Sequence, residues 1–256
     1  MSDLSTYRIL VSNDDGIAAR GLKLLEHVAK SLSKDVWVVA PELEQSGAGH
    51  SLTLRRPLRI RQLSRRRFAV DGTPTDAVLL GINHILKRRK PDLVLSGINR
   101  GGNMGEDVTY SGTIAAAMEA TLLGVPAIAL SLHYTNGAKE HWETPEAMAP
   151  AIIRKLIAAG WPKNVMINVN FPDRAPDAVQ GFSIARQGRR KLGDQLGERV
   201  DMRGEHYYWI GPLREEAASR EGTDIWAVNE GRVAITPLDL DLTHDPTSVA
   251  LAGVFP

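Results

Sequence analysis

Two adjacent aspartates, Asp14 and Asp15, stand directly before Gly16 near the start of the chain. Within a strand, neighbouring side chains point to opposite faces, but Gly16 lets the chain turn so that both carboxylates can face one point. Two adjacent carboxylates repel each other, and one takes up a proton unless a cation neutralises them. The pair therefore indicates a site for Mg²⁺ or Mn²⁺, which prefer oxygen ligands. A turn in which one aspartate caps a helix is the alternative.

Two later loops offer neutral oxygen atoms to the same site. Ser46 lies in a glycine-bearing loop, and Asn99 follows a short apolar run. In an open parallel sheet, ligands bind beyond the carboxyl ends of the strands, so these loops converge on the aspartates. We expect one divalent ion held by Asp14, Asp15, Ser46 and Asn99, with positions left open for catalysis. Taken alone, a serine in such a loop simply makes a turn.

The sequence Tyr110-Ser111-Gly112-Thr113 opens a helical pattern and follows a glycine-rich approach over residues 99–105. Ser111 and Thr113 are good helix-capping residues, and Gly112 permits the close approach of an anion. Free backbone N–H groups at a helix start bind phosphate. The segment therefore indicates a phosphate site, although a plain helix cap explains each residue separately.

Several other catalytic motifs are absent from the sequence. There is no Gly-Lys-Ser/Thr of a P-loop, no Gly-x-Gly-x-x-Gly after the first strand and no Gly-x-Ser-x-Gly elbow. The seven histidines show no zinc-binding spacing, and the lack of cysteine excludes a thiol nucleophile. His50 is the histidine nearest the expected site, and loop packing is its simpler role.

The elements that must position these residues alternate between apolar strands and amphipathic helices. Strands without polar alternation, joined by helices, predict a parallel sheet covered on both faces. We therefore expect a Rossmann-like three-layer αβα sandwich with a mostly parallel sheet. The predicted strands are Tyr7–Ser12, Val36–Ala40, Asp92–Ser96 and Pro126–Leu132, and the predicted helices follow Gly16, begin at Thr75 and span Ser111–Leu123.

Two stretches depart from this alternation. Alternating residues between Leu52 and Val70 predict a β-hairpin inserted at the sheet edge, about residues 52–70. Helical periodicity fades after Pro172, and we expect a C-terminal β-hairpin arm in this region. Residues 181–211 are polar and glycine-bearing, with an aromatic strand at 207–209, and further strands are expected at Ile225–Val228 and Arg232–Thr236. The predicted division is a catalytic core over residues 1–175 and an extension over 176–256 that serves oligomerisation.

Composition excludes several classes of protein. Lys and Arg total 31 against 30 for Asp and Glu, so the net charge of +1 argues against nucleic-acid binding. The arginine-rich hairpin and the basic run 87–90 are expected to be solvated faces. We see neither a signal-peptide pattern nor an apolar run of about 18 residues, and therefore expect a cytoplasmic protein that does not span a membrane.

The sequence resembles the SurE family, the survival protein E nucleotidases, in motifs that span nearly the whole chain. The matching stretches are Ile9–Ile17, Ala40-Pro41 with Gln45–Gly47, Gly72–Asp76, Pro91–Asn99, Gly105–Thr113 to Met118-Glu119, Asn168–Pro172 and Thr223–Val228. The stretch 181–211 is the least alike.

The resemblance implies a divalent-metal phosphatase that acts on nucleoside monophosphates, with short polyphosphate as a substrate of some relatives. It places the metal on Asp14, Asp15, Ser46 and Asn99. It places the phosphate on a second set of residues, Asn103, Ser111, Gly112 and Thr113. It also implies a homodimer or homotetramer in which the C-terminal hairpin is exchanged between subunits.

We therefore predict a phosphomonoesterase that hydrolyses nucleoside 5′-monophosphates, and possible further substrates are 3′-nucleotides and polyphosphate. Asp14 or Asp15 acts as a general base, or Asp14 attacks phosphorus directly; the sequence does not separate these routes. The alternative is a non-catalytic nucleotide-binding or sensing module on the same fold. The carboxylate pair discriminates between them, because a pure anion binder gains nothing from two aspartates beside its ligand.

Overall fold

The computed structural model describes residues 3–135, 139–190, 196–210 and 219–255. Its strands are β1 (Arg8–Ser12), β2 (Asp35–Pro41), β3 (Ile60–Ser64), β4 (Arg67–Val70), β5 (Leu93–Arg100), β6 (Ala127–Leu132), β7 (Val165–Phe171), β8 (Phe182–Ile184), β9 (Leu196–Val200), β10 (His206–Ile210) and β11 (Val233–Asp239). Its α-helices are α1 (Arg20–Leu32), α2 (Pro74–Leu80), α3 (Gly112–Leu122), α4 (Glu143–Ala159), α5 (Asp224–Asn229) and α6 (Asp245–Ala252).

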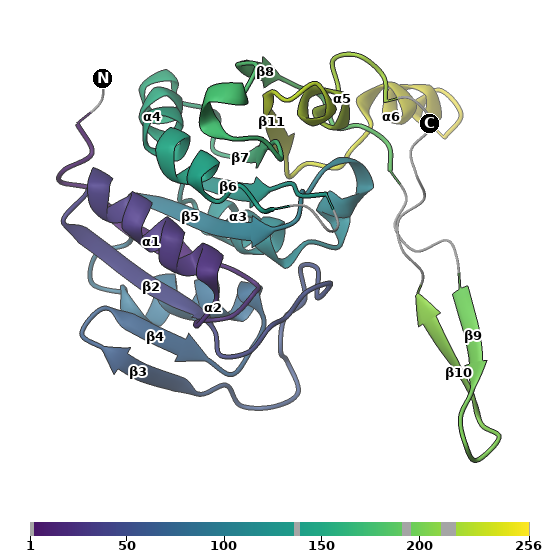
Figure 1. The fold of residues 1–256 in the computed structure, drawn as a ribbon, viewed down its shortest axis with the longest axis horizontal. Helices are drawn as coiled ribbons and strands as arrows, with labels where there is room; N and C mark the ends of the chain where they lie inside the picture. The colour runs from purple at the N-terminus through teal and green to yellow at the C-terminus, as the bar shows by residue number, and fades with distance from the viewer. Residues whose placement is uncertain (1–2, 136–138, 191–195, 211–218, 256) are drawn as a thin grey trace.

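Within the described ranges, nine strands form one sheet in the order β3-β4-β2-β1-β5-β6-β7-β11-β8. The central pairs from β4 to β7 are all parallel, whereas β3 and β11 run antiparallel to their neighbours β4 and β7. Figure 1 shows helices on both sides of this sheet. The predicted Rossmann-like, mostly parallel αβα sandwich is confirmed.

Both faces of the sheet are buried, and this explains the continuous apolar strands. In β1, Ile9 and Val11 pack with α1 and α4, whereas Leu10 packs with α2 and α3 on the other face. Gly21 of α1 is needed for close packing, because a Cβ there would come within 1.8 Å of the Ile98 carbonyl oxygen. The strands and helices predicted for the first 132 residues all occur, with ends shifted by a few residues.

The predicted hairpin insertion is confirmed as β3 and β4, with β4 pairing in parallel with β2 at the sheet edge. Asp76 in the first turn of α2 anchors the segment that leads into it. Its carboxylate accepts hydrogen bonds from the Thr53 backbone N–H at 3.0 Å and the Thr53 hydroxyl at 2.6 Å, and from the Thr73 N–H at 2.9 Å. Thr73 caps the helix in return, so local capping also fixes the hairpin.

The strand predicted at Ile225–Val228 is wrong, because these residues lie in helix α5. The Thr223 hydroxyl accepts a hydrogen bond from the Trp226 backbone N–H and caps this helix. An apolar run of four residues fits a buried strand or a buried helical turn equally well, so periodicity alone could not decide. The strand predicted at Arg232–Thr236 is confirmed as β11.

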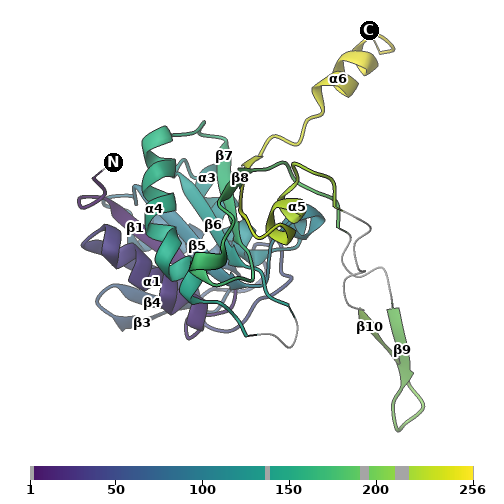
Figure 2. The same cartoon turned by 45° about the horizontal axis from the view of Figure 1, so that its top comes forward.

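The C-terminal region contains the predicted hairpin arm, formed by antiparallel β9 and β10. Figures 1 and 2 show this hairpin projecting from the body, and Figure 2 shows α6 extending in another direction. Residues 191–195 and 211–218 of the region in which the arm was predicted lie outside the described residues. Strands β8 and β11 belong to the main sheet, and α5 packs against β7, β8 and β11. The predicted division into a core and an extension near residue 175 therefore stays a prediction. No helix in the described part of the chain is long and apolar enough to cross a membrane.

Candidate active site

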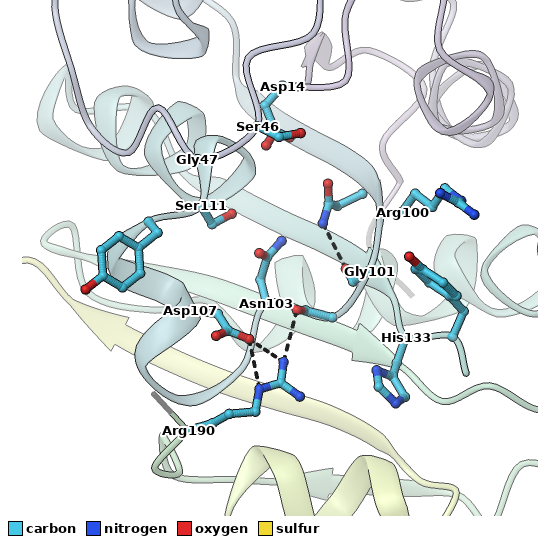
Figure 3. Close-up of a pocket in the computed structure, with 14 residues that line it drawn as sticks. Asp14, Ser46, Gly47, Arg100, Gly101, Asn103, Asp107, Ser111, His133 and Arg190 are labelled. Atoms are coloured by element: carbon cyan, nitrogen blue, oxygen red, sulfur yellow. Dashed lines mark hydrogen bonds and ion pairs between the residues drawn. The ribbon is translucent and has the colours of Figure 1, made fainter. Parts of the chain in front are cut away.

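A cavity of about 340 Å³ opens at the carboxyl ends of the central strands. It is lined by residues from the loops after β1, β2, β5 and β6 and by the start of α3, as parallel topology requires. Five of the predicted site residues line it together, namely Asp14, Ser46, Asn99, Asn103 and Ser111. The other predicted residues, Asp15, Gly112 and Thr113, are sequence neighbours of these. Figure 3 shows the arrangement around Asn103.

Asp14 is nearly buried, with 4% of its surface exposed, and it faces the start of α3. The Thr113 hydroxyl donates a hydrogen bond to Asp14 Oδ1. Gly112 permits this contact, because a Cβ there would lie 2.6 Å from the Asp14 Cβ. Burial raises the pKa of Asp14, and the hydrogen bond from Thr113 offsets only part of that effect.

Asp15 is only partly buried, yet its ionisation is strongly opposed. Burial, followed by the charge of Asp14, raises the pKa of Asp15 to about 7. A hydrogen bond with the Arg100 backbone and the positive charge of its guanidinium act in the opposite direction. A bound cation would attract both carboxylates and so lower the pKa of Asp15. The electrostatics of the pair therefore favour cation binding.

The donor atoms around the pair fit a hard divalent cation. No group of three or more His, Cys, Asp or Glu side chains that could hold a metal occurs among the described residues, so the carboxylate pair needs neutral oxygens to complete a shell. Asn99 supplies one: its amide nitrogen donates to the Gly101 carbonyl at 2.9 Å, which leaves the carbonyl oxygen for a metal. The exposed Ser46 hydroxyl also borders the cavity and hydrogen-bonds Glu44 Oε1 at 2.9 Å. Such an oxygen set suits Mg²⁺ or Mn²⁺.

The predicted phosphate residues differ in the contacts they make. Ser111 is the N-cap of α3, and its hydroxyl accepts a hydrogen bond from the Ile114 backbone N–H at 3.1 Å. Thr113 is engaged with Asp14, through its hydroxyl and through its backbone. Gly112 lies between them at the helix start, where backbone N–H groups are available to an anion. The phosphate-binding role of these residues stays a prediction.

A buried network of amides holds Asn103 in place. The Asn103 backbone N–H donates to Asn170 Oδ1 at 2.8 Å, and the Asn103 carbonyl accepts from the side chains of Asn168 at 2.8 Å and Asn170 at 3.1 Å. The Asn103 side chain donates to the Ser131 hydroxyl at 2.8 Å. Asn168 and Asn170 were not predicted as site residues. Their spacing of two on an apolar strand, which places them on one face, was the available signal.

A buried ion pair closes the other side of the cavity and was also missed. Arg190, which lies far along the chain, forms an ion pair with Asp107, and their side chains are only 11% and 5% exposed. Asp224 ties the two segments together by accepting hydrogen bonds from the Gly105 N–H at 3.0 Å and the Gly188 N–H at 2.8 Å. Figure 3 shows Arg190 between Asp107 and the Gly101–Asn103 loop. No local sequence pattern predicts contacts over such separations.

His50 and the arginine-rich hairpin lie outside the cavity lining. His50 Nε2 lies 3.0 Å from Glu119 Oε2 on α3, which agrees with a loop-packing role. The arginine-rich hairpin is a surface with several ion pairs, including Arg61 with Glu42 and Arg67 with Glu26. It therefore fits the expected solvated face.

The fold and this cavity define a doubly wound α/β protein with a carboxylate pair beside the N-terminus of helix α3. The chain belongs to the SurE family: residues 9–194 match the family described as Survival protein SurE. It is 62% identical over 255 residues to the 5′-nucleotidase SurE of Paramagnetospirillum magneticum, covering 100% of this chain and 98% of that protein. It is 54% identical over 258 residues to the 5′-nucleotidase SurE of Rhodospirillum rubrum, again covering 100% and 98%.

A solved structure has the same fold. The crystal structure of the SurE protein from Aquifex aeolicus superimposes with a TM-score of 0.85 at 40% sequence identity, covering 97% of this chain and 99% of that one. The resemblance inferred from the motifs is therefore confirmed at the level of family and fold.

Proposed function

We propose that this SurE protein is a divalent-metal-dependent 5′-nucleotidase that hydrolyses nucleoside 5′-monophosphates to nucleoside and phosphate. The observation that carries the proposal is the contact between Asp14 and the start of α3, which joins a cation site to an anion site in one cavity. A phosphate group bound there would meet both the cation and the helix N-terminus. The names of the relatives support the choice of nucleotide and of the 5′ position.

The residues proposed to hold one Mg²⁺ or Mn²⁺ ion are Asp14, Asp15, Ser46 and Asn99. When bound, the cation supplies positive charge that neutralises the phosphate oxygens. The protein contributes a carboxylate pair whose mutual repulsion that charge relieves. Asn99 lies in β5, and the other three residues follow β1 and β2. Because the parallel strands fix these positions, little ordering is needed when the cation binds.

The start of α3 and Asn103 are proposed to bind the phosphate oxygens. The Gly112 backbone N–H and the Asn103 amide would donate to the anion, whereas Thr113, whose hydroxyl and backbone contact Asp14, would hold the helix start beside that carboxylate. The network with Asn168 and Asn170 holds Asn103 still, so little reorganisation is needed as charge develops on the phosphate.

Asp15 is proposed to accept the proton of the attacking water. Its carboxylate, kept ionised by the bound cation, would be available to take the proton of a water molecule beside the phosphate. Asp14 is the alternative base, or the nucleophile of a covalent route, although its Oδ1 is already hydrogen-bonded to Thr113. Trapped phosphate on Asp14 would support the covalent route. Inversion of configuration at a chirally labelled phosphorus would support the direct route, because two successive displacements would retain the configuration.

We further propose activity on 3′-nucleotides and short polyphosphate, and a homodimer or homotetramer that uses the hairpin arm. The arm exposes apolar residues that an isolated chain would leave in water, including Tyr208 at 60%, Trp209 at 67% and Ile210 at 77%. Light scattering of the wild type and of Trp209→Ser tests the assembly: a lower mass for the variant is expected, and equal masses would contradict it.

The test of activity is phosphate release from 5′- and 3′-nucleoside monophosphates and short polyphosphate, with EDTA and after Mg²⁺ or Mn²⁺ is restored. We expect release from 5′-nucleotides that EDTA abolishes and either metal restores. Absence of release with every metal, while nucleotide still binds, would show that the chain is a nucleotide-binding module instead.

A further inference from the structure

The side of the cavity that faces away from Ser111 and Gly47 carries Arg100, His133 and Tyr134. All three line the same cavity as Asp14 and Asn103. Figure 3 shows Arg100 and His133 across the cavity from Ser111. The proposed cation and phosphate sites use none of these side chains.

The Arg100 and Tyr134 side chains form a braced pair. The Arg100 guanidinium carbon lies 4.7 Å from the centroid of the Tyr134 ring, within the range of a cation–π contact. Arg100 Nε donates to Glu140 Oε1 at 2.6 Å, and Glu140 Oε2 accepts from Trp142 Nε1 at 2.6 Å. Trp142 is buried, so the contacts through Glu140 tie the exposed Arg100 side chain to the protein core.

Two glycines connect this pair with the proposed cation site. Gly101 adopts φ +120°, and a Cβ there would lie 3.7 Å from Asn99 Nδ2 and 3.9 Å from Tyr134 Cε1. A Cβ on Gly102 would lie 3.3 Å from His133 Nδ1. Gly101 and Gly102 therefore place backbone without side chains between Asn99 and the Tyr134 ring.

We propose that Tyr134, braced by Arg100, is the surface on which the base of the nucleotide stacks, with His133 facing the base edge. The proposal rests on the proposed function, and it deepens that function by assigning the nucleoside half of the substrate to named residues. An aromatic ring can stack on any nucleobase, because every base has a π-face. This surface therefore favours nucleotides over other phosphomonoesters without strong selection of one base.

The chemistry of His133 fits this position. Burial, together with the nearby charge of Arg190, lowers the pKa of His133, so its ring is neutral at neutral pH. A neutral imidazole has one donor and one acceptor nitrogen. It can therefore pair with the mixed donor and acceptor edges of nucleobases, whereas a charged ring could only donate.

Tyr110 is the other aromatic residue of the cavity, and it provides a matched control. It directly precedes Ser111, at the phosphate end, and 42% of its surface is exposed. Tyr134 instead lies beside Gly101 and Arg100, on the side of the cavity away from Ser111. The two tyrosines therefore predict different outcomes for the same substitution.

The experiment measures kcat/KM for AMP and for glycerol 2-phosphate, which carries no base, on wild type, Tyr134→Ala, Tyr134→Phe and Tyr110→Ala. We expect the AMP to glycerol-phosphate ratio to fall about tenfold in Tyr134→Ala, equivalent to about 1.4 kcal/mol. Tyr134→Phe, which keeps the ring, and Tyr110→Ala should retain the wild-type ratio. An unchanged ratio in Tyr134→Ala, or a selective fall in Tyr110→Ala, would overturn the proposal.

Calorimetry with adenosine separates this inference from the proposed function. Adenosine has the base and no phosphate, so its binding does not depend on catalysis. Affinity about tenfold weaker in Tyr134→Ala than in wild type is expected, even if wild type releases no phosphate from AMP. Equal affinities of the two proteins, or no binding of adenosine to wild type, would contradict the assignment of Tyr134.

Discussion

Replacing Asp15 by Asn should stabilise the metal-free protein while it removes the proposed cation site. Asp15 has its pKa raised from 3.8 to about 7 by burial and then by the charge of Asp14. At about 1.36 kcal/mol per pKa unit, this shift corresponds to a penalty of about 4 kcal/mol for ionised Asp15 in the folded state. Asp15 is partly exposed, and solvent screening reduces the penalty to about 2 kcal/mol.

The sign of the pH dependence follows from linkage. A folded-state pKa above the unfolded value means that the folded protein binds the extra proton, so stability from this group is complete below pH 3.8 and is lost as pH rises towards 7. Asn cannot ionise and keeps a similar shape. With EDTA present, the free energy of unfolding of Asp15→Asn should exceed that of wild type by about 2 kcal/mol at pH 8. The difference should vanish near pH 4.

Urea unfolding at pH 8 and pH 4 measures both values, and Asp35→Asn is the matched control. Burial opposes the ionisation of Asp35, but hydrogen bonds from Arg8 and Trp37 outweigh it and lower its pKa. Its stabilising contribution is therefore present above the unfolded pKa and is lost as pH falls. Asp35→Asn should destabilise at pH 8. If Asp15→Asn were no more stable than wild type at pH 8, the proposed repulsion within the carboxylate pair would be refuted.

Three further results are expected. Gly112→Ala places a Cβ 2.6 Å from the Asp14 Cβ, and displacement of the helix start should lower kcat/KM about 100-fold in steady-state assays, whereas an unchanged value would show that the contact is unimportant. Asn170→Ala removes two hydrogen bonds to the Asn103 backbone and should lower the unfolding free energy by about 2 kcal/mol in urea; a loss near zero would contradict the network. Mn²⁺ at 100 times its Kd should raise the unfolding free energy of wild type by about 2.7 kcal/mol in thermal melts, and a similar rise in Asp15→Asn would place the ion elsewhere.

Much of the fold could be predicted because the decisive signals are local. Residues such as Ile9, Leu10 and Val11 are buried on both faces of the sheet, so their unbroken apolar run reports a covered parallel strand. Parallel topology then brings the loops after β1, β2 and β5 to one edge without any knowledge of distant contacts. For this reason Asp14, Ser46 and Asn99 were predicted together, and the structure places all three on one cavity.

The parts that could not be predicted depend on contacts between distant segments or on ambiguous short runs. The ion pair of Arg190 with Asp107 joins residues that are close only after the C-terminal segment folds back across the cavity. The pairing of Arg100 with Tyr134 depends on Glu140, which fixes the guanidinium. Ile225–Val228 was mistaken for a strand because four apolar residues carry no periodicity. Such features are set by tertiary packing, which a single sequence does not display.

The role of the carboxylate pair in catalysis is tested by a Mn²⁺ titration of wild type and Asp15→Asn, followed in parallel by calorimetry and by phosphate release from AMP. We expect one binding event per chain in wild type, a release rate that rises with the same midpoint, and the loss of both in Asp15→Asn. Phosphate release that persists in EDTA, or in Asp15→Asn at the wild-type rate, would contradict the claim that this carboxylate pair holds the cation used in catalysis.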